Sequence, residues 1–202
     1  MKLTASIGSL ILAMLPLVAC AEPVRISDQN APFVYEVKAE IPTPKESLAK
    51  MISADYRRAP DEFTAHELFE KIAPVIDKRI TEAKATKEWN VVIGGQLAQY
   101  DFNKKGFPTG FSETTFIPYD NGYALMFSNA AGFGLLPVEM ANAKRLSGML
   151  QRNRSCSIIV EGTVVGSKEE DLNYSSRKVI VLEISRLTIK LQDGTEVGAV
   201  TK

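Results

Sequence analysis

The chain has 202 residues, with 24 basic and 24 acidic side chains and a formal net charge of zero. This balance argues against electrostatic capture of nucleic acid by the whole chain. A hydrophobic content of 45% is enough to form a core, and the length fits one domain with an N-terminal extension.

Residues 1–19 have the pattern of an export signal. Lys2 supplies a short positive region, and residues 3–19 follow without a charge. This apolar stretch suits a signal peptide and is too short to span a bilayer comfortably. It ends in Leu17-Val18-Ala19-Cys20, which resembles the lipobox of bacterial lipoproteins. The resemblance implies cleavage before Cys20 once fatty acyl chains such as palmitate have been attached.

The same residues allow a second interpretation, in which an ordinary signal peptidase cuts after Ala19-Cys20-Ala21, an A-x-A-like site. If Cys20 is lipidated, Ala21 rather than Asp follows it, and the resemblance then implies the outer membrane. We therefore expect a cell-envelope protein that faces the periplasm, is anchored to the membrane by lipid, and binds another envelope protein. Nucleic acid is not expected as a partner.

Residues 20–45 are expected to form a Pro-rich tether that holds the folded part off the membrane. The spacing of the prolines stops any long helix, and the apolar alternation over 33–37 indicates one short strand. The prolines of this segment are Pro23, Pro32, Pro42 and Pro44.

Residues 46–88 are expected to be helical. One helix covers about 46–58. A second begins near Thr64, which forms a capping-box pattern with Glu67, and its apolar face repeats at steps of three and four residues. Pro74 is expected to kink or split this second helix.

Residues 89–202 are expected to form an antiparallel β domain with one inserted helix. Asn121-Gly122 predicts a tight hairpin, because both turn positions need a positive φ. Pro137 is expected to open the inserted helix, with an apolar stripe of Leu136, Met140, Ala143, Leu146 and Leu150. The expected strands are 89–102, 111–119, 123–127, one that starts near 156, 178–191 and 195–200.

The segment 178–191 carries a change of phase. Its apolar residues alternate up to Ile184 and then shift to Leu187, so one strand keeps both sets on one face only if a bulge adds a residue. We place this bulge near Ser185-Arg186. Asp193-Gly194 is then expected to turn the chain into the last strand.

These elements predict an α+β fold in which N-terminal helices precede a curled antiparallel sheet or a small barrel. The order of three strands, a helix and two to three strands is similar to the OB-fold. An α+β domain with a strongly curled antiparallel sheet is the broader form of the same prediction.

The sequence contains no strong catalytic, metal-binding or cofactor-binding constellation, and the chain is not expected to be an enzyme. The single histidine, His66, has Glu70 where a zinc-protease motif needs a second histidine. Cys156 alternates with Ile158 and Val160, which indicates a thiol buried in the core.

Residues 100–190 are similar to a family of uncharacterised bacterial exported proteins. Tyr100-Asp101-Phe102 with Gly106-Phe107-Pro108 carries the resemblance, which continues through Leu136-Pro137 and through Val165-Gly166 to Arg177-Lys178. No activity is established for that family, so the resemblance transfers none.

The candidate binding residues come from two predicted loops, at 103–110 and 166–176. If the fold is OB-like, these loops frame the ligand face and bring together a basic and aromatic rim. The alternative is that Phe107 packs back onto the core and that both loops are only solvated. We therefore expect a non-catalytic binding or assembly module, with two alternatives left open: a barrel that binds oligosaccharide or single-stranded nucleic acid, and an unrecognised envelope hydrolase. The rim residues are Lys104, Lys105, Phe107, Lys168 and Tyr174.

Overall fold

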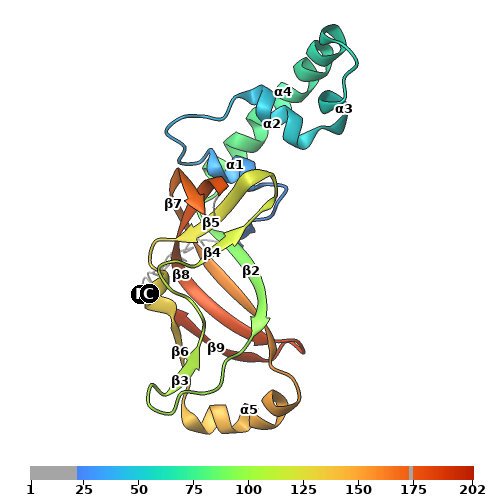
Figure 1. The fold of residues 1–202 in the computed structure, drawn as a ribbon. Coiled ribbons are helices and arrows are strands. Elements are labelled where there is room, and N and C mark those ends of the chain that lie inside the picture. Colours follow the sequence, from blue (N-terminus) through green and yellow to red (C-terminus); the bar gives the residue numbers. More distant parts are fainter. Residues whose placement is uncertain (1–21, 173–174) are drawn as a thin grey trace, which may run out of the picture.

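A computed structural model describes residues 22–172 and 175–202, and a seven-stranded mixed sheet forms its centre (Figure 1). The strand order is β1-β2-β7-β8-β5-β4, and β9 pairs with the remaining part of the long β8. The strands of this sheet are β1 (Val24–Arg25), β2 (Trp89–Gln96), β4 (Phe116–Pro118), β5 (Tyr123–Phe127), β7 (Ser155–Leu172), β8 (Ser175–Leu191) and β9 (Glu196–Thr201).

The predicted bulge is confirmed in the long hairpin formed by β7 and β8. Glu161 pairs with Arg186, but the next residue, Gly162, pairs with Ile184, so Ser185 is left as an extra residue in β8. A second register shift follows between Val164 and Gly166 of β7. Bulges increase local twist and bending, and the hairpin curls strongly over its length (Figure 1).

The predicted α+β fold is wrong, both as an OB-like barrel and as a curled antiparallel sheet, because the sheet is open and mixed and the fold is α/β. β5 pairs with β8 in parallel, from Tyr123 with Lys178 to Phe127 with Leu182, and β1 pairs with β2 in parallel. The prediction assumed that strands close in sequence pair antiparallel, which is the usual case. Here the β7–β8 hairpin occupies the centre, and strands from distant parts of the chain add to its edges.

Two strands of the sheet are shorter than predicted, and the segment around Phe107 pairs outside the sheet. β2 ends at Gln96, and only Phe116–Pro118 of the expected strand 111–119 pairs with β5. The predicted hairpin at Asn121-Gly122 is confirmed, with φ values of 59° and 80°. A separate antiparallel pair forms from β3 (Gly106–Pro108) and β6 (Leu135–Pro137).

The inserted helix is α5 (Met140–Arg152), and it begins three residues later than predicted. Pro137 ends β6 instead of opening the helix. Ala143, Leu146 and Leu150 of the expected apolar stripe are buried, whereas Met140 is exposed.

The N-terminal helices are mostly short and are attached to one end of the sheet (Figure 1). Ser53 ends α2 (Lys45–Ile52) and caps α3 (Ala54–Arg57), since its Oγ accepts a hydrogen bond from the N–H of Tyr56 at 3.1 Å. Asp61 rather than Thr64 caps the long helix, which continues through Pro74 without splitting. The long helix is α4 (Glu62–Ala85).

The described part of the expected tether is folded onto the domain, which corrects that prediction. Residues of α1 (Ala31–Tyr35) are all buried, and Pro32 lies in the first turn of this helix, where a missing N–H costs little. The Oγ of Ser167 donates to the carbonyl of Tyr35 at 2.6 Å, and the Nζ of Lys178 donates to the hydroxyl of Thr43 at 2.6 Å. The predicted strand over 33–37 is therefore a helix, and the segment is part of the fold.

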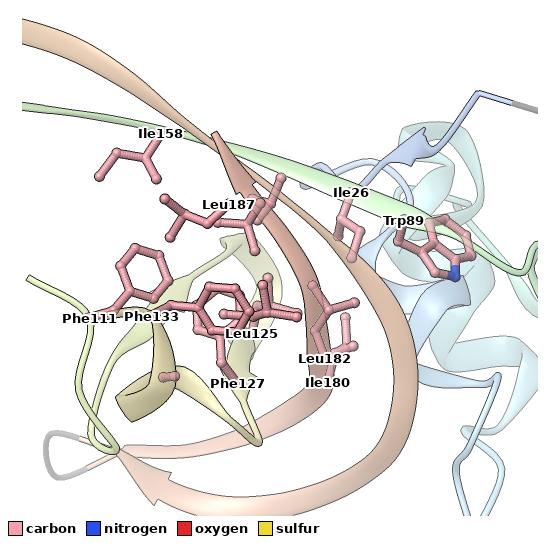
Figure 2. Packing of buried hydrophobic residues seen from close by; sticks show 14 of the residues in the cluster. Ile26, Trp89, Phe111, Leu125, Phe127, Phe133, Ile158, Ile180, Leu182 and Leu187 are labelled. Carbon is pink, nitrogen blue, oxygen red and sulfur yellow. The ribbon is translucent and has the colours of Figure 1, made fainter. Parts of the chain in front are cut away.

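The core lies inside the curve of β7 and β8 (Figure 2). Phe111 packs against Phe127, with ring centroids 5.2 Å apart, and the same layer contains Phe133 and Leu125. Residues from loops, from β5 and from the hairpin therefore share one core.

Across residues 22–172 and 175–202, no helix combines the length and the apolar character that a membrane crossing requires.

Candidate binding groove

The loop that contains Lys104 and Lys105 is a closed turn. The N–H of Asp101 donates to the carbonyl of Gly106 at 2.8 Å, and the carboxylate of Asp101 accepts from the N–H groups of Asn103 and Lys104 at 2.9 Å. Both lysine side chains are exposed, as predicted, and Lys105 has a φ of 54°. The turn therefore presents two cations from a backbone held by its own hydrogen bonds.

Phe107 lies in the interior instead of at an exposed loop tip. Its side chain is 1% exposed, and it pairs with Leu136 across β3 and β6. Its ring meets that of Tyr100 edge to face, with centroids 5.2 Å apart. The prediction of a solvent-exposed stacking residue at position 107 is wrong, because a strand pairing buries this side chain.

The second predicted loop is a pair of strands, and it does not meet the first. Lys168 lies on β7, exposed, with its Nζ 2.5 Å from a carboxylate oxygen of Glu170. The neighbouring Ser167 contacts Tyr35 of α1, so this part of the hairpin is at the helical end, whereas β3 is at the α5 end (Figure 1). The expected rim is not formed among the described residues, and Tyr174 lies outside them.

A different hollow lies beside α5, and we call it the α5 groove. It has a volume of about 430 Å³ and runs between α5 and the segment 99–107. Phe102 and Met140 are 70% and 55% exposed, yet both line it. The residues that define the groove are Tyr100, Phe102, Phe107, Met140, Lys144 and Arg154.

Hydrogen bonds hold the walls of this groove in place. The hydroxyl of Tyr100 donates to the carbonyl of Val138 at 2.8 Å, which joins one wall to the start of α5. The Nε of Arg154 donates to the carbonyl of Leu97 at 2.6 Å, and a terminal nitrogen of Arg154 donates to the carbonyl of Ala98. The groove is therefore preformed.

Aromatic packing continues from the interior of the groove to its surface. The ring of Tyr100 meets the rings of Phe102 and Phe107 edge to face, each with centroids 5.2 Å apart. Phe107 is buried beneath, while Phe102 is exposed. Buried Phe107 and half-buried Tyr100 thus support an aromatic side chain that faces solvent.

The sequence interpretation assigned these groove residues differently or left them out. Met140 was expected in the buried stripe of the helix, and Phe102 at the end of a strand. Tyr100, Lys144 and Arg154 were not included in the site. A usable signal was present in α5, where Met140 and Lys144 are one turn apart and so share a face. Nothing in the sequence indicated that the segment 99–107 would lie against this face.

Groups that could support catalysis are dispersed or buried. Burial raises the pKa of the Cys156 thiol, and burial also raises the pKa of Tyr119 and of Tyr123 to about 12. His66 is exposed on α4. Within the described ranges, no cluster of three or more His, Cys, Asp and Glu side chains is placed to hold a metal ion.

The fold and the groove define a mixed α/β protein with a surface hollow beside α5. The chain belongs to the family described as "Domain of unknown function (DUF4852)", whose match covers residues 48–148, half of the 202-residue chain. The expected resemblance to an uncharacterised family is thereby confirmed, although the matched segment begins and ends before the expected 100–190. It includes five of the six residues that define the α5 groove, all except Arg154.

Neither the comparison with curated proteins nor the comparison with solved structures found a match.

Proposed function

We propose that the protein is a non-catalytic lipoprotein of the cell envelope, that it is anchored through Cys20, and that it acts as a binding or assembly module. The observation that carries the binding role is the pair of exposed apolar side chains, Phe102 and Met140, that line one preformed hollow. Exposed apolar side chains around a concave surface are typical of sites that bind a partner.

The rigidity of the groove supports a binding role. Tyr100 and Arg154 are tied to backbone carbonyls of neighbouring segments, so a partner would meet walls that are already ordered. A preformed surface loses less conformational entropy on association, which favours binding.

The state of the ionisable groups supports a non-catalytic role. A nucleophilic cysteine needs a lowered pKa, and burial acts in the opposite direction on Cys156. His66 lies on the exposed side of α4, whereas Cys156 pairs with Gly95 and Leu191 towards the α5 end.

The experiment that tests this proposal is photo-crosslinking in cells from position 102 of the full-length protein. A photoreactive amino acid replaces Phe102, and a matched variant carries the same amino acid in place of Phe63. Phe63 is a suitable control because it is also an exposed phenylalanine, at 75%, but lies on α4. We expect a specific adduct from position 102 and a much weaker one from position 63.

Met140→Ala should reduce the adduct from position 102, because the partner loses an apolar contact that lies in the same groove. Truncation of a hot-spot residue at the centre of an interface weakens binding by roughly thirtyfold or more. Equal adducts from positions 102 and 63, or an adduct unaffected by Met140→Ala, would show that the α5 groove is not the binding site.

A further inference from the structure

The α5 end of the molecule is basic although the chain as a whole is neutral. The segments 97–110 and 134–155 together contain six cations and two acids, Asp101 and Glu139, a difference of four positive charges. Because the chain has 24 basic and 24 acidic residues, the rest of it carries an excess of four negative charges. The six cations are Lys104, Lys105, Lys144, Arg145, Arg152 and Arg154.

These cations are not neutralised within the fold. Among the described residues, the ion pairs are those of Lys45, Lys78 and Lys168, and none involves the α5 end. Asp101 directs its carboxylate to the backbone N–H groups of its own turn. Asp101, Glu139 and also Asp193, which lines the hollow that contains Arg145 and Arg152, oppose the six cations, so this end of the molecule keeps a net positive charge.

The cations also lie on both flanks of α5. Lys144 and Arg154 line the α5 groove, and a second hollow of about 610 Å³ on the opposite flank is lined by Arg145 and Arg152. A ligand in the groove therefore meets two cations, Lys144 and Arg154, and no acidic side chain among the described lining residues, while its apolar parts meet Phe102 and Met140.

The position of β1 favours a partner protein over the membrane. β1 pairs with Trp89 and Asn90 at the start of β2, whereas Gln96, at the other end of β2, leads into the groove segment. Seven steps along a strand cover about 23 Å. With lipid on Cys20, the two residues before Glu22 reach at most about 7 Å, so the anchor holds the β1 end near the bilayer and leaves the groove away from it.

We propose, on the basis of the proposed function, that the α5 groove binds an acidic segment of another envelope protein. Such a segment places a large apolar side chain between Phe102 and Met140 and its carboxylates against Lys144 and the cations around it. Complementary charge steers association and selects the partner, while the apolar contact supplies most of the affinity.

The test extends the crosslinking experiment by identifying what is attached to position 102. The intact lipoprotein is crosslinked in cells, and mass spectrometry then defines the attached segment. We expect a polypeptide of net negative charge with at least one large apolar residue. A synthetic peptide of that segment should bind the purified full-length protein, and a peptide with its acids changed to amides should bind more weakly.

A matched pair of charge reversals tests the role of the basic end. Lys144→Glu should lower the affinity for that peptide by roughly threefold or more, since one exposed charge pair changes affinity by about 1.4- to 5-fold and reversal adds repulsion. Lys71→Glu, an exposed lysine on α4, should leave the affinity unchanged. Both variants should keep the melting temperature of the parent protein, and Lys144→Gln replaces Lys144→Glu if the latter does not fold.

The outcomes separate the two proposals. An adduct with a phospholipid, with a second copy of this chain, or with a neutral or basic segment would overturn the acidic-partner inference but would keep the groove as a binding site. Equal loss of affinity in Lys71→Glu and Lys144→Glu would also overturn the inference. Absence of a specific adduct at position 102 would instead remove the proposed function itself.

Discussion

Cys156 lies on β7 between Gly95 of β2 and Leu191 of β8, and its side chain is 4% exposed. The prediction that this thiol is buried in the core is confirmed. Burial removes the thiolate from water, which disfavours the charged form and raises the thiol pKa. Thiol reagents react with the thiolate. Limited solvent access and a low fraction of thiolate therefore both protect Cys156 in the folded protein.

We therefore expect a thiol reagent to label Cys156 slowly in the native protein and rapidly after denaturation. The measurement uses a Cys20→Ser variant, in which Cys156 is the only cysteine, and follows labelling by absorbance or mass. Ser147→Cys in the same background supplies an exposed thiol on α5 as the control. If Cys156 in the folded protein reacts as fast as the thiol introduced on α5, it is accessible and the assignment to the core is wrong.

The β7–β8 hairpin is the element that shapes the sheet. Its bulge at Ser185 shifts the apolar phase of β8, so that Ile184 and Leu187 both face the core. The close approach of the two strands at the bulge requires a glycine, because a Cβ on Gly162 would lie 2.1 Å from the carbonyl oxygen of Glu183. Backbone atoms cannot move aside as the end of a side chain can.

Gly162→Ala should lower the free energy of unfolding by about 2 kcal/mol or more, because the added methyl group forces the paired strands apart. Gly166→Ala is the matched control on the same strand. A Cβ there meets only side-chain atoms of Val181, at 3.6 Å and beyond. Chemical denaturation of both variants measures the difference, and similar stabilities would show that the hairpin does not approach as closely as described.

At the scale of the whole molecule, β1, near the start of the described residues, and the α5 groove are at different ends of β2. This arrangement is what a lipid-anchored binding module needs, because the anchor and the ligand then do not compete for space. It holds only if lipid is attached at Cys20 and not if the chain is cut after Ala21.

We expect radiolabelled palmitate to label the full-length protein in cells and the label to be lost in Cys20→Ser, which should also leave the membrane fraction. Cys156→Ala is the control, and it should keep both the label and the membrane association, because the buried thiol is not an acylation site. Retained membrane association and label in Cys20→Ser, or a mature protein that begins at Glu22, would contradict lipidation at Cys20.

Local chemistry predicted several elements correctly. Asn121-Gly122 and Asp193-Gly194 turn the chain because positive φ is easily adopted by glycine and asparagine, and strands pair on either side of both turns. The shift in apolar phase located the bulge at Ser185, because a strand keeps one face buried only by adding a residue. Each of these signals is contained in a few neighbouring residues.

Pairing between distant segments was decided only by the tertiary structure. Whether β5 pairs with β8 in parallel depends on which edge of the hairpin is free. The residues of β5 do not indicate this pairing partner or its direction. The same applies to residues 22–45, which read as a Pro-rich tether until their contacts with β2, β5 and β8 are known.

The candidate site shows the same division. From the sequence by itself one could obtain the exposed lysines of the turn at 101–106, the buried Cys156 and the resemblance to an uncharacterised family. Only the tertiary structure shows that Phe107 is buried in a strand pair and that Lys168 lies far from Lys104. It also shows that Phe102 and Met140 line one groove. The physical reason is that periodicity shows which face of an element is apolar, whereas packing alone decides what covers that face and what leaves it open to a partner.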